Sequence, residues 1–421
     1  MFITALDIGT NKIKALVAES KNNKLFLHKI FRAPSSGIRK GEIVDIDETK
    51  NSLKEIFEKI KEFDKSAVKN IFVNIGGANI KSHNSKGIIA VSRGDNEITQ
   101  DDIDRVNKAS QAIKLHSNRE IIHTITKEFI IDGVEDIRDP LGMNGARLEV
   151  NNIIIDAFSP NIKNIISLIE MLGGNIGGLA YNPLVASRAV LTKIQKDLGA
   201  VLIDIGAGAT SIGVYEEGKL LHAASFPVGA GHITNDLAIG LKCSVKLAEL
   251  IKIFFGCATL KGISPKEKIT LDDIVEKSGI DFSDVEKNFK AVISKREVVD
   301  IIESRLTEIF EFVNNELKLI NKAGRLPGGA ILCGGGAKLP LILDLAKEEL
   351  GLPVEIGLLV RQLADKNIEI IDSDADGDVF NPEFAVAFGL LLLGEEHYSN
   401  VNKWSISDKF SIKSILRYFM P

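Results

Sequence analysis

Cysteine and excess positive charge are both scarce in this sequence, and each shortage argues against a class of protein. Three cysteines occur, Cys243, Cys257 and Cys333, and their spacing fits no metal site. An odd number of thiols favours a reducing cytoplasm, where we expect them to be small core side chains. The net charge of −5 gives no overall basic surface, so nucleic acid is not an expected partner.

Long apolar runs are also missing. The longest, Phe384 to Leu393, falls short of the ~20 helical residues that cross a bilayer, so we interpret it as a buried helix. The N-terminus runs directly into a strand pattern with an acid at Asp7, and we expect no signal peptide. The chain has 421 residues, 45% hydrophobic and 26% charged, which predicts two or more domains with substantial cores.

Two similar stretches organise the chain. In the first-half copy, an apolar strand from Ile3 ends in Asp7-Ile-Gly-Thr10, and a second strand follows. In the other copy, an apolar strand from Val201 ends at Asp204, and the small turn Gly206-Ala-Gly208 leads into a second strand. Both read as β-hairpins with a tight first turn. The duplication predicts two similar α/β domains with a ligand between them.

The chemistry of these turns suits a nucleoside triphosphate. Small residues let backbone N–H groups approach an anion closely. A carboxylate at a strand end can hold Mg²⁺ through water, because Mg²⁺ keeps much of its hydration shell. A third segment, Ala330 to Pro340, has an apolar strand, three glycines that admit a flat base against the backbone, and a helix start.

Together these three segments resemble the two phosphate loops and the adenosine loop of the actin/Hsp70/sugar-kinase superfamily. Within it, nearly the whole chain is similar to the FtsA family of actin-like bacterial division proteins, and Gly37 to Asp47 resembles a signature of that family. The resemblance implies an α/β fold of the actin-like (ribonuclease-H-like) type with ATP and Mg²⁺ between duplicated domains. It also implies an inserted α+β subdomain called 1C and a further subdomain called 2B.

The resemblance assigns roles to individual residues. Asp7 and Asp204 are expected to hold Mg²⁺ through water and to act in catalysis. Asn182 stands where actin has a water-positioning Gln, but on a shorter arm, so we predict a slow ATPase or none. The residues expected to bind the nucleotide are Gly9, Thr10, Asn11, Lys12, Gly206, Ala207, Gly208, Ala209, Thr210, Gly231, Gly334, Gly335, Gly336 and Ala337.

Glu249 and Lys252 lie one turn apart on a predicted helix. They match the Glu and Lys that reach the ribose and base in Hsp70-like members. The alternative is an ordinary ion pair on a helix surface, which this spacing also favours.

The predicted subdomains follow the family's layout. The insertion has strands and a helix that begins at Thr99 but no phosphate loop of its own. The predicted bounds are 1–82 and 160–198 for subdomain 1A, 83–159 for 1C, 199–243 and 328–394 for 2A, 244–327 for 2B, 395–407 for a linker and 408–421 for a terminal helix.

Subdomain 2B carries a long predicted helix, Lys295 to Leu319, with Arg296 and Arg305 on its solvent side. In the family this subdomain binds the acidic, apolar tail of FtsZ, so both arginines are candidate partner residues. The alternative is a solvated basic face.

Asp372 to Glu383 matches the calcium-binding EF-hand loop pattern. No helix precedes it, because Ile368 to Ile371 reads as a strand. Pro382 and Glu383 also look like the first turn of the last helix, with Asn381 as N-cap. We interpret the segment as a solvated acidic loop and keep a weak Ca²⁺ site as the alternative.

The C-terminal stretch 408–421 has the pattern of a basic amphipathic helix that lies in a bilayer interface. A polar linker precedes it, whereas a helix packed on its own domain, the alternative, rarely needs one. A single short helix binds weakly, so polymerisation would be needed to sum many anchors. The residues expected at the membrane are Phe410, Ile412, Lys413, Ile415, Leu416, Arg417 and Phe419.

The sequence therefore predicts an ATP-binding actin-like filament protein that anchors the FtsZ ring to the cytoplasmic face of the cell membrane at the division site. Its expected partners are the FtsZ tail, further copies of itself, inner-membrane lipids and other division proteins. Two alternatives stay open. One is a pilus-assembly relative of FtsA, and the other is a small-molecule kinase, which would need an additional carboxylate as general base.

Overall fold

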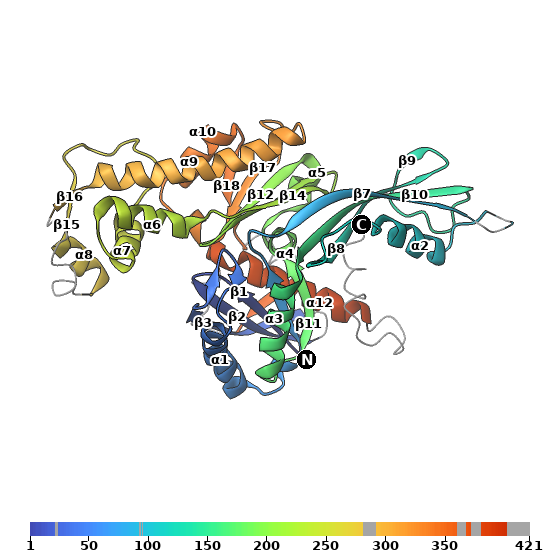
Figure 1. Ribbon diagram of the computed structural model, residues 1–421, viewed down its shortest axis with the longest axis horizontal. Coiled ribbons are helices and arrows are strands. Elements are labelled where there is room, and N and C mark those ends of the chain that lie inside the picture. Colours follow the sequence, from blue (N-terminus) through green and yellow to red (C-terminus); the bar gives the residue numbers. More distant parts are fainter. Residues whose placement is uncertain are drawn as a thin grey trace.

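The computed structural model describes residues 1–21, 24–91, 94, 96–280, 292–359, 368–371 and 380–401. For residues 399–401 it describes the backbone only. Two mixed sheets form the centre of the molecule, one in each half (Figure 1). The strands of the first sheet, in order, are β11 (Ile176–Tyr181), β6 (Ile71–Ile75), β1 (Phe2–Ile8), β2 (Lys12–Lys21), β3 (Lys24–Pro34) and β19 (Ile368–Ile370). Those of the second are β18 (Val354–Ile356), β17 (Gly329–Cys333), β12 (Ala200–Ile205), β13 (Thr210–Glu216) and β14 (Lys219–Phe226).

The two sheets repeat one topology. In the first, β1 is antiparallel to β2, β2 is antiparallel to β3, and β1 is parallel to β6, which is parallel to β11. In the second, β12, β13, β14, β17 and β18 pair in the same order and directions. The central strands are buried on both faces, as their unbroken apolar runs predict. The predicted duplication is therefore confirmed.

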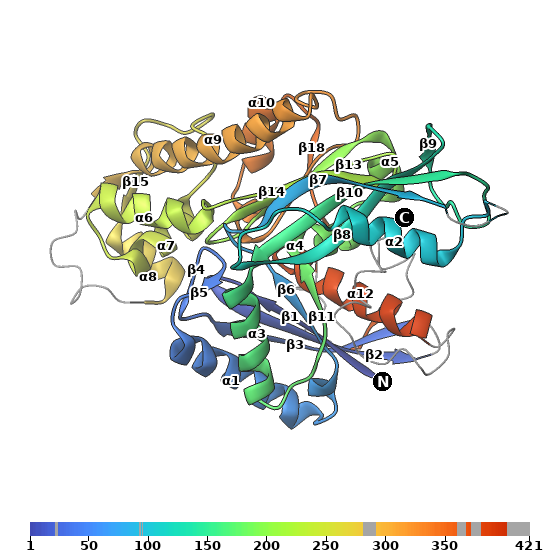
Figure 2. The same cartoon turned by 45° about the vertical axis from the view of Figure 1, so that its right-hand side comes forward.

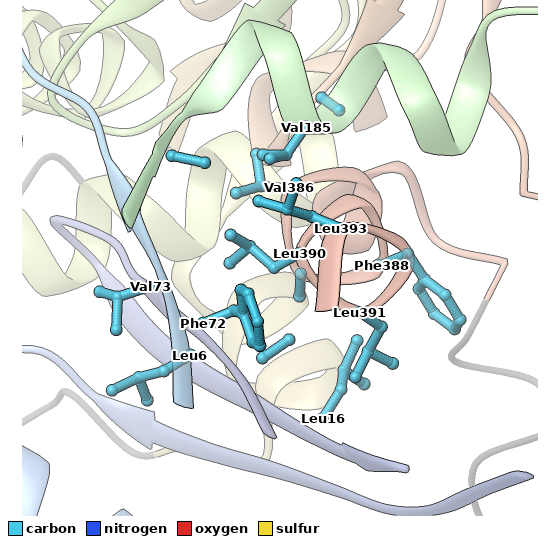
Figure 3. Packing of buried hydrophobic residues seen from close by; sticks show 14 of the residues in the cluster. Leu6, Leu16, Phe72, Val73, Val185, Val386, Phe388, Leu390, Leu391 and Leu393 are labelled. Carbon is cyan, nitrogen blue, oxygen red and sulfur yellow. The ribbon is translucent and has the colours of Figure 1, made fainter. Parts of the chain in front are cut away.

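Helix α12 (Ala385–Val401) forms the core of the first half. Its side chains fill the space between the sheet and α4 (Asn182–Val190), with Leu390 and Leu391 directed at the strands (Figure 3). The two helices cross so closely that a Cβ at Gly389 would lie 1.9 Å from the Val185 carbonyl oxygen. A glycine is required there for the helix backbones to touch. The apolar run was therefore correctly predicted to be a buried helix.

Two further helices of the first half, α1 (Ile46–Phe63) and α3 (Ser159–Met171), pack against each other (Figure 2). The Asp45 carboxylate begins α1 by accepting a 2.9 Å hydrogen bond from the Glu48 N–H. The sequence from Tyr181 to Leu198 predicts one continuous helix, and this prediction was wrong. Leu191 is extended, and Thr192 caps a separate helix, α5 (Lys193–Leu198), through a reciprocal bond with Gln195.

The insertion forms a sheet of its own with one covering helix, and it projects to one side of the molecule (Figure 1). Its core is a small separate cluster that includes Val106 and Phe129. The elements are β7 (Lys81–Ala90), α2 (Gln100–Ser110), β8 (Arg119–Ile131), β9 (Val134–Ile137) and β10 (Arg147–Phe158), in the sheet order β7-β10-β8-β9.

The second half carries its extra helices at the opposite end (Figure 1). The long helix is observed with the predicted bounds as α9 (Lys295–Leu319), and it packs on α6 and α10. The other elements there are α6 (Ala230–Leu241), α7 (Val245–Phe255), β15 (Lys268–Thr270), α8 (Leu271–Ser278), β16 (Val292–Ser294) and α10 (Ile342–Leu350).

The predicted linker needs a correction at its start. Residues 395–401 belong to α12, and the Tyr398 hydroxyl donates a 2.6 Å hydrogen bond to the Asn70 side chain. The residues predicted to contact the membrane, from Phe410 to Phe419, lie outside the described part of the chain. Within the described part, no helix combines the length and apolarity needed to cross a bilayer.

Candidate nucleotide site

The ends of β1 and β12 face each other across a cleft between the halves, and each delivers a buried aspartate. Asp7 is 5% exposed and Asp204 is 6% exposed. Both line an inner cavity that continues into an outer cavity of about 920 Å³. The inner cavity is also lined by Gly9, Thr10, Asn11, Lys12, Asn182, Gly206, Ala207, Gly208, Ala209, Gly334 and Gly335.

Asp7 is paired with a buried lysine that the sequence analysis missed. The Lys14 Nζ lies 2.8 Å from Asp7 Oδ2, and the two residues are directly opposite in the β1–β2 register. Burial acts to lower the pKa of Lys14, but the charge and hydrogen bond of Asp7 outweigh it, and the pKa lies above its usual value. Lys14 interrupts the apolar run from Ile13 to Ala18, and this was the available signal.

Asp204 has no such cation opposite it, because its partner in the β12–β13 register is Ser211. Burial raises the pKa of Asp204 to about 6, and repulsion by Asp7 adds to the rise. A hydrogen bond from Asn182 and the charge of Lys14 oppose it. Two buried carboxylates share one lysine, and a hydrated divalent cation would supply the missing charge. This donor set fits Mg²⁺ held through water.

A chain of side-chain amides crosses the cleft from one half to the other. The Ile8 N–H donates to Asn74 Oδ1 at 2.7 Å, and Asn74 Nδ2 donates to Asn182 Oδ1 at 3.2 Å. Asn182 Nδ2 then donates to Asp204 Oδ2 at 3.3 Å. Asn182, the first residue of α4, therefore lies beside Asp204 in the cleft, and its role with water stays a prediction. Asn74 was missed, although an Asn inside the buried strand β6 was a visible signal.

The two predicted phosphate loops touch. A Cβ on Gly208 would lie 2.5 Å from Thr10 Oγ1, so only glycine allows this approach. The N-terminus of α6 leans on the second loop, where the Gly231 N–H donates to the Ala207 carbonyl oxygen at 2.8 Å. Thr210 is buried as the first residue of β13 and lines neither cavity. The other predicted residues of both loops face the cleft.

The glycine segment after β17 closes the far side of the cleft. A Cβ on Gly334 would lie 2.5 Å from Asp204 Oδ1, while one on Gly335 would meet nothing within 4 Å. Gly335 therefore offers open backbone to a ligand. Gly335 and Gly336 line the outer cavity, whereas Ala337 is buried and lines neither.

Glu249 and Lys252 both line the outer cavity. Lys252 is 8% exposed, and its Nζ lies 2.7 Å from Glu249 Oε2, 2.8 Å from Thr234 Oγ1 and 3.2 Å from the Ala230 carbonyl oxygen. The two residues do form an ion pair, but it is part of a buried network that joins α7 to the start of α6. Apolar residues that the sequence analysis did not single out complete this wall, namely Val245, Leu250, Ile253, Leu339 and Pro340.

The described end of the EF-hand-like pattern belongs to the cleft. The Asn381 side chain accepts from the Glu383 N–H at 3.4 Å, as expected of a cap, and Glu383 lines both cavities. Its carbonyl oxygen accepts a hydrogen bond from Lys14, and its carboxylate lies 3.6 Å from Lys338. Residues 372–379 lie outside the described residues. The C-terminal end of the pattern thus contributes to the wall of the cleft.

The two candidate partner arginines on α9 differ from one another. Arg296 is exposed near the start of the helix. Arg305 donates to both carboxylate oxygens of Asp236, at 2.6 and 3.0 Å, and also pairs with Glu308. The hydrogen bond to Asp236 raises the pKa of Arg305. Much of the charge on Arg305 is therefore already balanced within the fold.

Comparison with known proteins follows this division of the chain. A family model described as "SHS2 domain inserted in FTSA" matches residues 77–156, and one described as "Cell division protein FtsA" matches 201–389. The cell division protein FtsA of Pseudomonas aeruginosa is 31% identical over 408 residues, which are 96% of this chain and 92% of that protein. The chain belongs to the FtsA family. Bacillus subtilis FtsA is 35% identical over 346 residues, 82% of this chain and 76% of its own.

Solved structures show the same fold at lower identity. The chain resembles one in a PilM–PilN type IV pilus biogenesis complex with a TM-score of 0.63 and 16% identity, over 93% of this chain and 98% of that one. It resembles MreB5 of Spiroplasma citri bound to ADP with a TM-score of 0.54 and 16% identity, over 96% and 99%. These likenesses confirm the predicted actin-like fold of this FtsA-family chain.

Proposed function

We propose that this FtsA-family chain binds ATP with Mg²⁺ between its halves, assembles with copies of itself on the cytoplasmic face of the membrane, and tethers the FtsZ ring there at the division site. The observation that carries the proposal is the opposition of Asp7 and Asp204 across a cleft walled by two glycine-containing loops. Family membership favours this function over pilus assembly and over a small-molecule kinase.

Three features of the cleft support nucleotide binding. The loops after β1 and β12 present backbone to an anion from both sides. The buried carboxylates need a cation, and Mg²⁺ would bring charge that neutralises both them and the phosphates. The outer cavity offers Gly335, Glu249 and an apolar wall to adenosine. Two structures of MreB5 with this fold are bound to ADP and AMPPNP.

Hydrolysis is expected to be slow. Asn182 would have to hold the attacking water, but its amide already joins Asn74 to Asp204 at 3.2 and 3.3 Å. A water would have to displace one of these bonds. We therefore expect the function to depend on which nucleotide is bound and not on rapid hydrolysis. Steady turnover above about one per second, within the usual range of enzymes, would contradict this.

The membrane role rests on residues 408–421 and is tested by flotation of the full chain with anionic liposomes in the presence of Mg²⁺ and ATP. The matched truncation ends at Val401, because residues 397 and 398 pack on Phe72 and belong to the folded body. We expect the full chain to float and the truncation to stay behind. Leu416→Asp should abolish flotation and Ser414→Asp, on the polar flank, should retain it. Equal flotation of the truncated chain would exclude the tail as anchor.

The tether role predicts binding of a synthetic FtsZ C-terminal peptide near α9. Arg305 is already paired, so an acidic peptide would gain more from the exposed Arg296. Arg296→Ala should weaken peptide binding, measured by fluorescence anisotropy. Lys318→Ala removes an exposed charge from the other end of the same helix and should leave binding unchanged. Equal effects of the two substitutions would indicate that only the overall positive charge of the helix attracts the peptide.

A further inference from the structure

A short hairpin in the first half lies against both phosphate loops. Its strands are β4 (Ile38–Arg39) and β5 (Glu42–Ile43), and Lys40 and Gly41 form the tip. The Gly41 N–H donates to Thr10 Oγ1 of the first loop at 3.0 Å. A Cβ on Gly208 of the second loop would lie 2.9 Å from the backbone of Lys40. The tip therefore sits where the two loops meet.

The tip is held in an uncommon backbone conformation. Lys40 has φ +50° and Gly41 has φ +77°, the pair of positive values that a two-residue type I′ hairpin turn requires. Lysine is not a residue that adopts this region readily, and such strain is retained where the surroundings enforce it. The Lys40 carbonyl accepts from the Ala78 N–H at 3.1 Å, and the Ile43 N–H donates to Asn161 Oδ1 at 3.1 Å. The hairpin is thus fixed from both sides.

The tip brings two cationic side chains to the cleft. Arg39 and Lys40 are exposed, and both line the outer cavity together with Thr10 and Gly208. The one acid of the hairpin, Glu42, lines neither cavity and accepts a 2.5 Å hydrogen bond from Asn79. The charge that the tip presents to the cavity is therefore positive, in a place where the loops already suit an anion.

The direction of a bound nucleotide decides which phosphate these cations meet. The adenosine side is built from Gly335, Glu249 and Lys252 of the second half. A nucleotide that starts there and runs between the two loops ends where the loops touch, at Thr10 and Gly208. That point is the base of the hairpin tip, so the last phosphate is the one nearest to it.

We propose that the Arg39–Lys40 tip is a third phosphate-binding segment, which contacts the terminal phosphate of ATP and makes the chain prefer ATP to ADP. This inference rests on the proposed binding of ATP in the cleft. A guanidinium and an ammonium each gain charge-assisted hydrogen bonds with phosphate oxygens. ADP lacks the phosphate that reaches the tip, so it gains little from either group.

The test compares the affinities of the full-length chain for Mg·ATP and Mg·ADP by calorimetry. In Arg39→Gln/Lys40→Gln we expect the Kd for ATP to rise about tenfold or more, the loss typical of a charged contact, and the Kd for ADP to change less than about twofold. Arg39→Lys/Lys40→Arg should keep the preference. The matched control, Lys54→Gln/Lys59→Gln, removes two cations from α1, far from the cleft, and should change neither affinity.

Each other outcome is decisive. Equal weakening for ATP and ADP would overturn the proposal, because the tip would then act on phosphates that both nucleotides share. Unchanged affinities in a double variant with normal thermal unfolding would overturn it as well. If the unaltered chain binds neither nucleotide, the proposed ATP site itself is wrong. A double variant that does not fold is replaced by Lys40→Gln alone, read by the same ATP-to-ADP ratio.

Discussion

The two halves share a sheet topology, but they differ in how they compensate the same buried acid. Across the first hairpin, Asp7 faces Lys14 at 2.8 Å, whereas across the second, Asp204 faces Ser211. One duplicated hairpin therefore holds an ion pair, and the other holds a carboxylate whose pKa is raised to about 6 by burial and by Asp7. The comparison indicates that the first half supplies a fixed positive charge, Lys14. The second half supplies a carboxylate, Asp204, that a bound cation would compensate.

The largest expected effect comes from removing the fixed charge. Lys14→Met keeps the length of the side chain but leaves Asp7 buried without its cation, which costs ~3–5 kcal/mol when a buried pair is broken. Ser211→Ala, at the equivalent position, removes only a neutral hydrogen bond and should cost about 1 kcal/mol. Urea denaturation measures both. Similar losses would show that the two positions are equivalent after all.

Replacing each of the two aspartates by asparagine should change the free energy of unfolding in opposite directions. Asp7→Asn leaves the buried Lys14 with the Glu383 carbonyl oxygen as an acceptor but without its paired carboxylate, and should destabilise the chain by ~2–4 kcal/mol. Asp204→Asn removes a disfavoured charge and should stabilise the metal-free chain by ~1–3 kcal/mol, since one pKa unit corresponds to about 1.4 kcal/mol. Unfolding would be followed at pH 7.5 with EDTA and without nucleotide. Destabilisation by both would contradict the division of roles, whereas both should weaken binding of Mg·ATP.

The halves also differ in their contacts with the insertion, and acid should weaken the contact of the first half. His123 on β8 accepts a 3.0 Å hydrogen bond from the Tyr181 N–H on β11, and burial lowers its pKa to about 3. An unfolded histidine titrates near 6.5, so the unfolded state binds more protons between these values and stability falls as pH drops. From pH 7.5 to 5 we expect a loss of ~1–2 kcal/mol from this residue.

His123→Gln retains an acceptor for the Tyr181 N–H without a titrating ring. The difference between the two chains at pH 7.5 and at pH 5 isolates the contribution of His123 from that of other groups, such as His397, whose pKa is also lowered by burial. An unchanged pH dependence in His123→Gln would show that His123 is not the group responsible.

The smallest expected difference in stability is between substitutions of the two turn glycines, Gly9 and Gly206, which have similar surroundings in the two halves. A Cβ on Gly9 would lie 2.8 Å from the Lys12 carbonyl oxygen, and one on Gly206 would lie 2.9 Å from that of Ala209. Alanine at either position forces the backbone to shift, at a cost of ~1–3 kcal/mol. We expect thermal unfolding of Gly9→Ala and Gly206→Ala to agree within ~0.5 kcal/mol. A larger gap would indicate that the loops have diverged in backbone as well as in charge.

The sequence was informative where local patterns decide the structure. The hairpins, the glycine segment after β17 and the bounds of α9 follow from apolar periodicity and turn residues, and these place most of the cleft. The helix break at Leu191 was missed, although Thr192 and Gln195 carry the capping pattern. The continuation of α12 to Val401 was missed because its last turns are polar and are held by tertiary contacts of Tyr398.

Residues whose role depends on long-range register were mostly out of reach. Asn74, Lys40 and Glu383 come from distant parts of the chain. Asn74 stands out as a polar residue in an apolar strand, but nothing local in the sequence links any of the three to Asp7 or Asp204. Lys14 is the exception, because a tight hairpin fixes which residue lies opposite Asp7. The charge balance of the cleft could therefore have been partly predicted, whereas the amide chain through Asn182 could not.

Helix α12 has a mechanical consequence. It follows directly on a 3-10 turn at Pro382–Phe384, where the Glu383 carbonyl accepts a hydrogen bond from Lys14, and its own 17 residues run ~25 Å to Val401. Along the way its backbone touches α4, the helix whose first residue is Asn182. Tension on a membrane-bound tail would thus be carried along α12 to Lys14, the partner of Asp7, and to the helix that begins with Asn182. Force on the membrane anchor and affinity for nucleotide would then be coupled through the same helix.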